Sequence, residues 1–253
     1  MSNLYFECAN GISGDMSVAA LLDLGADKNK LEKALNSLNL NNEFSYEIKD
    51  ILVNSIKAVD FNVLLKKAEN TKAQNNSQHT HNHEHRNIDD INEIIDKADI
   101  TNNAKLLAKK IFNIVAQAEA EVHKKDIKDV HFHEIGAIDS IADIIAFSVL
   151  FDDLNPSKVY FKTLTEGTGT VKCAHGIMNV PVPAVCEIAA KYKLPLKITD
   201  NEGEMITPTG AAIAAALYSR EKLPDNIIIK KIGYGRGKRP YPNPVLRVIE
   251  IDE

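Results

Sequence analysis

The sequence has few cysteines, and those it has are not arranged to cross-link the chain. Cys8, Cys173 and Cys186 are the only three in 253 residues, and no pair of them has the C-x-x-C spacing. An odd number of widely separated cysteines is untypical of the disulfide scaffolds of small secreted proteins. We therefore expect reduced thiols and a reducing compartment.

Long apolar runs are also missing. The longest, residues 211–218, falls well short of the roughly 20 residues that a membrane-spanning helix needs, and it predicts a buried helix instead. The N-terminus passes directly into an apolar strand pattern, without the charged start or the A-x-A cleavage site of a secretory signal. These absences predict a cytoplasmic protein with no membrane partner.

An excess of positive charge is absent as well. The chain has 30 Lys and Arg against 35 Asp and Glu, and its basic residues are too dispersed to form a nucleic-acid surface. It has no P-loop, and the G-Y-G-R-G-K-R at 233–239 is followed by prolines at 240, 242 and 244 rather than by a helix, which excludes a Rossmann dinucleotide loop. An alternative interpretation of this stretch is a basic, Gly-rich turn that binds an anion.

What the sequence does contain is 44% hydrophobic residues, enough for one sizeable core or two smaller ones. Apolar residues recur with period two in some segments and with helical period in others, so strands and helices are expected to alternate. We expect strands at 4–6, 159–161, 227–229 and 245–251, and a hairpin or a pair of edge strands within 44–65. We expect helices from the Ser13 cap to Gly25, through 31–38, from Asp89 or Asp90, and at 102–124, 183–192 and 208–220. The predicted fold class is α/β or α+β, a mixed sheet covered by helices.

Half of the eight histidines lie in one short tract, H-T-H-N-H-E-H. This tract contains His79, His81, His83 and His85 and belongs to a polar segment, 69–87, with almost no apolar residues to order it. We therefore expect a flexible, His-rich loop. Such a loop suits the capture of a transition metal, but it does not hold ligands to the precision of roughly 0.5 Å that catalysis requires. It is predicted to supply metal to a site elsewhere; the alternative is a loop that binds metal only incidentally.

The stretch with the most candidate metal ligands and catalytic groups is D-V-H-F-H-E-I-G-A-I-D-S-I-A-D, which ends at Asp143. On a strand, His131 and His133 would project to the same side, and on the following helix Asp139 and Asp143 share a face because they are four residues apart. With Glu134 they are predicted to form a mixed nitrogen and oxygen site for a divalent transition metal. The structural alternative is that Asp139 caps the helix, Asp143 is solvated and one histidine is part of the fold. An amidohydrolase also uses H-x-H, but it needs several further histidines downstream, and only one follows here.

Two other stretches offer room for an anion or a reacting group. Gly169 belongs to a Gly-rich stretch that ends at His175 and Gly176, where a turn would make the histidine available as ligand, acid or base. A bent strand with a surface histidine explains the same residues. Thr207 before Pro208 predicts a capped helix start, whose exposed amides suit a phosphate or carboxylate; ordinary helix capping explains it equally well.

The order of these stretches resembles the LarC family of nickel insertion proteins. The stretches that carry the resemblance are Y-F-E-C at 5–8 with G-I-S-G-D-M at 11–16, the histidine tract followed by Arg86, H-F-H-E-I-G-A-I-D-S-I-A-D at 131–143, A-H-G at 174–176 with P-V-P-A at 181–184, T-P-T-G-A at 207–211 and G-Y-G at 233–235. They extend over nearly the whole chain. The H-x-H-E-x-G-A-x-D-S and T-P-T-G-A blocks are the most distinctive.

The resemblance implies a specific reaction. Proteins of this family insert Ni²⁺ into a pyridinium mononucleotide that bears two thiocarboxylates, with CTP and Mn²⁺ or Mg²⁺ as helpers, and the product serves lactate racemase-type apo-enzymes. It implies a lyase-class nickel chelatase in which residues 1–253 are the nickel- and substrate-handling region. The family's C-terminal CTP-binding domain is absent from this chain, so a C-terminal partner chain or a homo-oligomer is expected to complete the enzyme.

Residue patterns and resemblance together designate three sets of site residues. The catalytic set is His131, His133, Glu134, His175 and Asp15; the substrate- or cofactor-binding set is Gly11, Ser13, Gly14, Gly169, Thr207, Thr209 and Gly235. The metal-binding set is His131, His133, Glu134, Asp139, Asp143 and the loop histidines His79, His81, His83 and His85. Two rival functions stay open: a nickel storage or metallochaperone module without catalysis, and a nucleotide-dependent hydrolase or transferase that uses Mg²⁺ or Mn²⁺.

Overall fold

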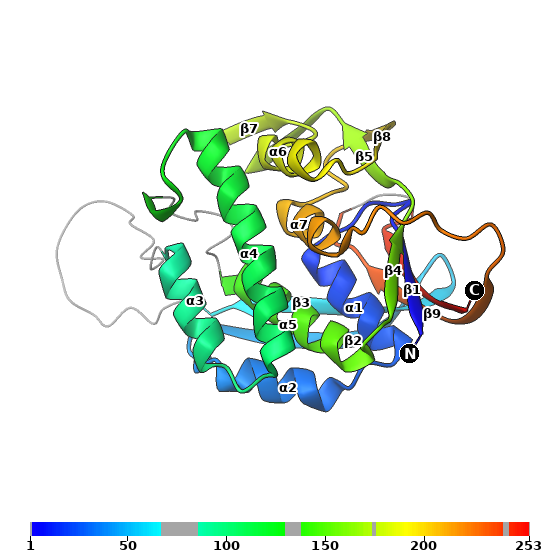
Figure 1. Ribbon diagram of the computed structural model, residues 1–253, viewed down its shortest axis with the longest axis horizontal. Helices are drawn as coiled ribbons and strands as arrows, with labels where there is room; N and C mark the ends of the chain where they lie inside the picture. Colours follow the sequence, from blue (N-terminus) through cyan, green and yellow to red (C-terminus); the bar gives the residue numbers. More distant parts are fainter. Residues whose placement is uncertain (1, 67–85, 130–137, 174–175, 240–242, 253) are drawn as a thin grey trace.

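The strands expected near both ends of the chain lie side by side in one six-stranded sheet (Figure 1). The computed structural model describes residues 2–66, 86–129, 138–173, 176–239 and 243–252. The order of the sheet is β2-β3-β9-β10-β1-β4, formed by β2 (Phe44–Val53), β3 (Ile56–Leu65), β9 (Ile228–Arg236), β10 (Val245–Asp252), β1 (Asn3–Glu7) and β4 (Lys158–Phe161). β1 pairs antiparallel with β10 and parallel with β4, and β3 pairs parallel with β9, so the sheet is mixed as predicted.

Seven α-helices lie in the described part of the chain, and they gather largely on one side of this sheet (Figure 1). They are α1 (Gly14–Leu24), α2 (Lys28–Ser37), α3 (Ile88–Lys97), α4 (Asn102–His123), α5 (Ile138–Leu154), α6 (Pro183–Tyr192) and α7 (Pro208–Leu217), with a 3₁₀ turn at Ile127–Asp129. α1 packs directly on β3, β9 and β10, and α4 packs on α5, α6 and α7. The predicted class, a mixed sheet covered by helices, is confirmed. The predicted flexible loop falls almost entirely on residues 67–85, outside the described residues.

Two small sheets accompany the large one. β5 (Leu164–Thr168) pairs in parallel with β8 (Leu196–Glu202), and β6 (Thr170–Cys173) forms an antiparallel hairpin with β7 (Gly176–Asn179). The sequence pattern does not predict β8, because most of its side chains are exposed and polar and give no apolar alternation.

The glycines of β9 explain how α1 comes so close to the sheet. A Cβ atom at Gly235 would lie 2.0 Å from the carbonyl oxygen of Met16, and one at Gly233 would lie 2.1 Å from that of Ala20. The reading of this stretch as an anion-binding turn is therefore wrong for residues 233–236, which are strand paired with β10. At Gly233 and Gly235, the absence of a side chain allows α1 to pack closely on the sheet.

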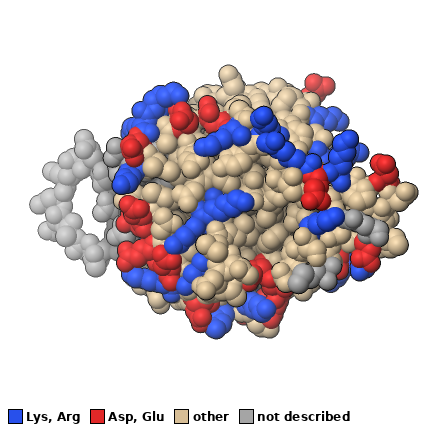
Figure 2. Space-filling model, viewed as in Figure 1, with Lys and Arg blue, Asp and Glu red and all other residues tan. Residues whose placement is uncertain are grey.

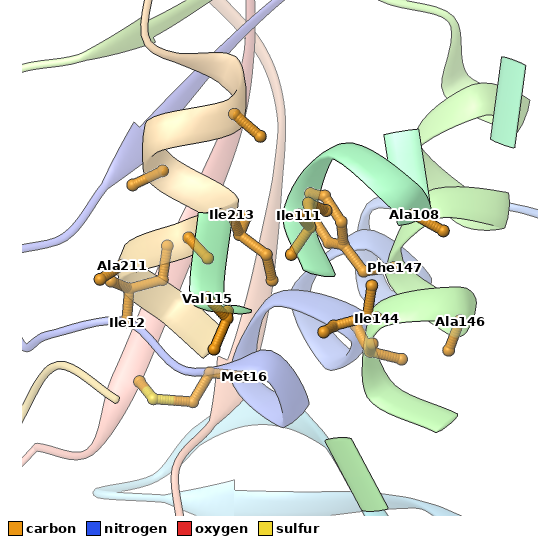
Figure 3. Packing of buried hydrophobic residues seen from close by; sticks show 14 of the residues in the cluster. Ile12, Met16, Ala108, Ile111, Val115, Ile144, Ala146, Phe147, Ala211 and Ile213 are labelled. Atoms are coloured by element: carbon orange, nitrogen blue, oxygen red, sulfur yellow. The ribbon is translucent and has the colours of Figure 1, made fainter. Parts of the chain in front are cut away.

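The core forms where α1, α4, α5 and α7 meet (Figure 3). Ile111 and Val115 of α4, Ile213 of α7 and Phe147 of α5 are fully buried there, and Met16 of α1 lies in the same cluster. The apolar run at 211–218 is a buried helix as predicted, since residues 209–216 of α7 are buried. Four helices are thus fixed against one another in the layer above the sheet.

Two helix boundaries differ from their predicted positions. α3 begins at Ile88, slightly earlier than expected, because Asn87 and Asp90 form a capping box at its start. α7 ends at Leu217 rather than Arg220, because the chain becomes extended at the next residue. On the face seen in Figure 2, basic and acidic side chains are interspersed with uncharged surface, in keeping with the balanced composition.

Candidate functional site

A cavity of about 740 Å³ opens where the ends of five helices converge. The N-terminal ends of α1, α5, α6 and α7 line it together with the C-terminal end of α4, and the remaining wall comes from β6, β7 and the loops at 204–207 and 237–239. Helix N-termini present backbone N–H groups and a positive partial charge. Four of them around one cavity suit a ligand with several anionic groups.

The start of α1 places Asp15 in the cavity wall. Ser13 caps the helix as predicted, with its side chain accepting a hydrogen bond from the Met16 N–H at 3.4 Å. Its hydroxyl also donates to one carboxylate oxygen of Asp15. The other oxygen of Asp15 lies 3.4 Å from Nζ of Lys238, so the carboxylate is held from two sides.

Asp139 and Asp143 approach the same place from α5. Both line the cavity from the first two turns of the helix, on the shared face that their spacing predicts. Asp139 lies inside the helix rather than at the cap position, since α5 already begins at Ile138. A Cβ atom at Gly14 would lie 2.7 Å from Oδ2 of Asp143, so only glycine lets this carboxylate reach the start of α1.

Desolvation and the nearby negative charges make these carboxylates reluctant to ionise. The pKa of Asp143 is raised well above its ordinary value, first by burial and then by the charges of Asp15 and Asp139; Lys238 opposes the shift. The pKa of Asp139 is raised chiefly by burial. A cation that entered the cavity would relieve this repulsion, so the three carboxylates favour a positively charged ligand.

The start of α7 is tied to the start of α1 through backbone bonds. Ile12 N–H donates to the carbonyl of Met205 at 3.0 Å, and Thr207 N–H donates to the carbonyl of Ile12 at 3.1 Å. Thr207 caps α7 as predicted, accepting from the Gly210 N–H at 3.1 Å. Two helix starts that carry predicted substrate- or cofactor-binding residues, Ser13–Gly14 and Thr207–Thr209, therefore face one cavity.

Basic side chains lie beside these helix starts. Lys238 and Arg239 line the cavity, and Arg239 pairs with the largely buried Glu204 at 2.7 Å. Lys238 and Arg239 belong to the basic stretch 233–239, for which an anion-binding turn is left open above, whereas no sequence pattern indicates that Glu204 lies in the cavity wall. Glu119 and His123 of α4 also line the cavity and are not predicted. A glutamate four residues before a histidine is equally typical of an ion pair on an exposed helix face, so the spacing does not indicate a cavity.

Three predicted ligand-binding glycines do not line the cavity. Gly235 packs against α1, and a Cβ atom at Gly11 would lie 2.0 Å from the carbonyl oxygen of Met205, so this glycine permits the pairing of two loops. Gly169 occupies the turn between β5 and β6 with φ 83°. Each has a conformational or packing reason that does not involve a ligand.

Several predicted site residues lie outside the described residues. They are His131, His133, Glu134, His175 and the loop histidines His79, His81, His83 and His85. Within the described ranges, no three His, Cys, Asp or Glu side chains are gathered so as to hold a metal ion. Cys173 lines the cavity, whereas Cys8 is buried and Cys186 is exposed; the described cysteines form no disulfide, as predicted.

Comparison with known proteins decides the family. The sequence model of nickel insertion proteins matches residues 4–253. The chain belongs to the nickel insertion protein family. This confirms the resemblance drawn from the sequence blocks. In this family member, G-I-S-G-D-M and T-P-T-G-A stand at the two helix starts that face the cavity.

Relatives of this nickel insertion family member are longer than the chain. The pyridinium-3,5-bisthiocarboxylic acid mononucleotide nickel insertion protein of Alkaliphilus metalliredigens is 49% identical, over 100% of this chain and 61% of its own length. Proteins of the same name from Acetivibrio thermocellus and Akkermansia muciniphila are 43% and 38% identical, over 94% and 100% of this chain and 57% and 61% of their own lengths. The chain therefore spans 57% to 61% of these relatives.

No solved structure matches the chain. None of the helices in the described part of the chain combines the length and the apolar character that crossing a bilayer requires.

Proposed function

We propose that this chain is the nickel- and substrate-handling part of an enzyme that inserts Ni²⁺ into pyridinium-3,5-bisthiocarboxylic acid mononucleotide, the compound in the relatives' names. The observation that carries the proposal is the composition of the cavity wall. Segments at 13–16, 139–143, 182–184 and 207–209 are far apart in the sequence, belong to the blocks that resemble the family, and line one cavity. Residues that are brought together in this way have a common ligand as their simplest explanation.

The substrate carries charges of both signs, and the cavity wall offers groups of both signs. Its phosphate suits the amides at the starts of α1 and α7, with Lys238 and Arg239 beside them. Its pyridinium ring is positive, and Asp15, Asp139 and Asp143 would offset that charge. Ser13, Gly14, Thr207 and Thr209 are therefore proposed as substrate-binding residues, and Asp15 as a catalytic residue beside them.

Nickel is proposed to reach this substrate through the block before α5. His131, His133 and Glu134 would hold Ni²⁺, and Asp139 or Asp143 would complete the shell or orient it. His175 would serve as a ligand, or as the base for the ring proton lost when carbon binds nickel. The loop histidines His79, His81, His83 and His85 would capture Ni²⁺ and raise its local concentration.

Completion of the enzyme is proposed to need the part that the relatives have beyond this chain. That part would bind CTP with Mn²⁺ or Mg²⁺, as a partner chain or within a homo-oligomer, and the reaction would be of the lyase class. We place the protein in the cytoplasm, with a lactate racemase-type apo-enzyme as acceptor of the product.

The proposal is tested by nickel insertion in vitro. The chain is incubated with Ni²⁺, CTP, Mn²⁺ and the unmetallated mononucleotide, with and without the C-terminal part of a relative, and the product is measured by mass spectrometry. We expect metallated product when both parts are present and a loss of at least about 100-fold in His131→Ala or His133→Ala, the magnitude typical of removing an essential catalytic group. Glu121→Gln, on the exposed side of α4, is the control.

Absence of product with both parts present would overturn the proposal. A storage or metallochaperone module makes a different prediction for removal of 79–85. Removal would abolish function if the chain only stores nickel, whereas an enzyme would lose insertion chiefly at low Ni²⁺ concentrations.

A further inference from the structure

The loop that follows β9 brings two cations to the cavity wall, and each is held by a different carboxylate. Lys238 pairs with Asp15 at the start of α1, and its charge opposes the raised pKa of Asp143. Arg239, the next residue, pairs with Glu204 instead, with 2.7 Å between Nη2 and Oε2. Lys238 thus offsets the carboxylates of α1 and α5, whereas Arg239 is held by a carboxylate outside that group.

Glu204 is carried by a part of the chain whose backbone is fixed. It precedes Met205, whose N–H donates to Glu166 at 2.6 Å and whose carbonyl accepts from Ile12 N–H at 3.0 Å. Glu204 is 8% exposed, whereas the side chain of Arg239 is 50% exposed. The buried carboxylate therefore fixes one edge of the guanidinium group and leaves the rest of that group accessible.

An arginine presented in this way suits a phosphate group. A guanidinium carries five N–H donors, so a bond to one carboxylate does not exhaust them. Its planar fork matches two oxygens of one phosphate, and a phosphate monoester carries nearly two negative charges at neutral pH. Arg239 and Glu204 line the same cavity as Thr207 and Thr209 at the start of α7. A phosphate in this cavity would meet an oriented cation as well as the amides of a helix start.

We propose that Arg239, oriented by Glu204, recognises the phosphate group of the mononucleotide and so distinguishes the nucleotide from its nucleoside. The inference rests on the proposed function, and it assigns this discrimination to one side chain. Arg239 is then a specificity-determining residue. Glu204 is a positioning residue, because it acts through Arg239. Neither is among the site residues predicted from the sequence.

The test compares two ligands that differ only in the phosphate. Nicotinic acid mononucleotide and nicotinic acid riboside share the pyridinium ring, its carboxylate and the ribose. Their dissociation constants are measured by NMR titration, which also follows weak binding. The variants of the full chain are Arg239→Gln, which removes the charge, and Arg239→Lys, which retains the charge without the fork. The matched control is Arg236→Gln, the same change at an arginine of β9 that pairs with Asp60 and does not line the cavity.

We expect Arg239→Gln to weaken binding of the mononucleotide by about 10-fold or more, the value of a hydrogen bond to a charged group, and to leave binding of the riboside unchanged. Arg239→Lys should lose less, and Arg236→Gln should match the wild type. Unchanged riboside binding also shows that the cavity is intact; if Arg239→Gln fails to fold, Arg239→Lys decides. Equal affinities of the wild type for the two ligands, or equal losses for both ligands in the Arg239 variants, would overturn the inference.

Glu204→Asp tests the positioning role separately. This change retains the negative charge but withdraws the carboxylate from Arg239 by one methylene, so a loss of affinity cannot come from a change of charge. We expect mononucleotide binding to weaken about 5-fold, the value of one ordinary hydrogen bond. In a protein that already carries Arg239→Gln, the same change should have no further effect, since no guanidinium is left to position. A loss of the same size in both backgrounds would refute the positioning role.

Cytidine monophosphate tests whether the phosphate belongs to the pyridinium mononucleotide or to CTP. It carries the same phosphate monoester on a different base. Binding of cytidine monophosphate that depends on Arg239 and is tighter than that of nicotinic acid mononucleotide would assign the site to the cytidine nucleotide and overturn the inference. Weaker binding of cytidine monophosphate is the expected result.

Insertion assays with the C-terminal part of a relative then distinguish this inference from the proposed function. If the wild-type protein inserts nickel but discrimination between nucleotide and nucleoside does not depend on Arg239, the phosphate role fails and the proposed function stands. If discrimination depends on Arg239 but the wild-type protein makes no metallated product, the proposed function fails and the phosphate site stands.

Discussion

One carboxylate oxygen of Glu166 accepts a hydrogen bond of 2.6 Å from the backbone N–H of Met205. The same oxygen accepts from the N–H groups of Ile206 and Gly167 at 3.1 and 2.8 Å, and Glu166 has no exposed surface. Met205 in turn accepts a bond from Ile12 N–H. Glu166 thus fixes the loop that connects the starts of α1 and α7, although it does not itself line the cavity.

Replacing Glu166 by Ala should destabilise the protein by about 3 kcal/mol, because buried N–H groups would lose a charged acceptor. Glu166→Gln retains an acceptor oxygen and should lose clearly less. Chemical denaturation at neutral pH measures both free energies of unfolding. Equal losses in the two variants would show that the acceptor oxygen does not hold this loop.

A second prediction concerns the free-energy cost of ionising the partly buried carboxyl group of Asp143. Its pKa is raised well above the ordinary value by burial and by neighbouring carboxylates. The folded state therefore holds a proton that the unfolded chain releases, and the free energy of unfolding falls as pH rises from about 4 to the raised pKa. Asp143→Asn should remove this fall and be more stable than wild type at neutral pH by at least about 1 kcal/mol, with the gain vanishing below about pH 4.

The matched control is Asp99→Asn, which changes an exposed carboxylate that pairs with Lys33 at 2.9 Å. It should keep the wild-type pH dependence. If Asp143→Asn keeps it as well, Asp143 is not the group that titrates. The same substitution should weaken the binding of a cation in the cavity, so greater stability and lost function are expected together.

Local features of this fold follow from the sequence more readily than contacts between distant segments. The Ser13 cap, the shared face of Asp139 and Asp143 and the Thr207 cap depend on residues a few positions apart, so spacing predicts them. That α1 and α7 start at one cavity depends on the pairing of Ile12 with Met205, which no local pattern encodes.

The misreading of Gly235 has a physical reason. Glycine is needed where a ligand approaches the backbone, and it is also needed where a helix approaches a strand. The sequence does not distinguish the two cases, because both require only that no Cβ is present. Lys238 and Arg239 belong to the stretch 233–239 that is left open as a basic, anion-binding turn, but they are not among the predicted site residues. Their loop gives no periodicity from which an inward direction can be read.

A third prediction follows from the contact of Gly235 with α1. Gly235→Ala would place Cβ 2.0 Å from the Met16 carbonyl oxygen and 2.6 Å from the Ala20 nitrogen. Because backbone atoms of a packed helix cannot move singly, we expect a loss of about 3 kcal/mol, the upper part of the range for overpacking. Gly237→Ala is the control, since its Cβ would meet the flexible side chain of Met16 at 2.8 Å. It should cost less than about 1 kcal/mol, because methionine repacks readily. Thermal unfolding of both variants measures the difference, and similar losses would mean that α1 can shift on the sheet.

The three cysteines report on occupancy of the cavity. Cys8 is 2% exposed, and burial raises the pKa of its thiol, so it should not react with a thiol reagent in the folded protein. Cys173 lines the cavity and Cys186 lies outside it on an exposed part of α6. A pyridinium mononucleotide such as nicotinic acid mononucleotide should therefore slow labelling of Cys173 and leave Cys186 unchanged.

The rates are measured by mass spectrometry of peptides after timed labelling, with and without the mononucleotide. Cys186 serves as the internal control, because a general change in the stability of the protein would alter both rates. At a ligand concentration ten times the dissociation constant, a bound ligand that covers Cys173 should slow its reaction about 10-fold, since only the unliganded fraction reacts. Equal labelling of Cys173 in the presence and absence of the nucleotide would show that the compound does not occupy this cavity.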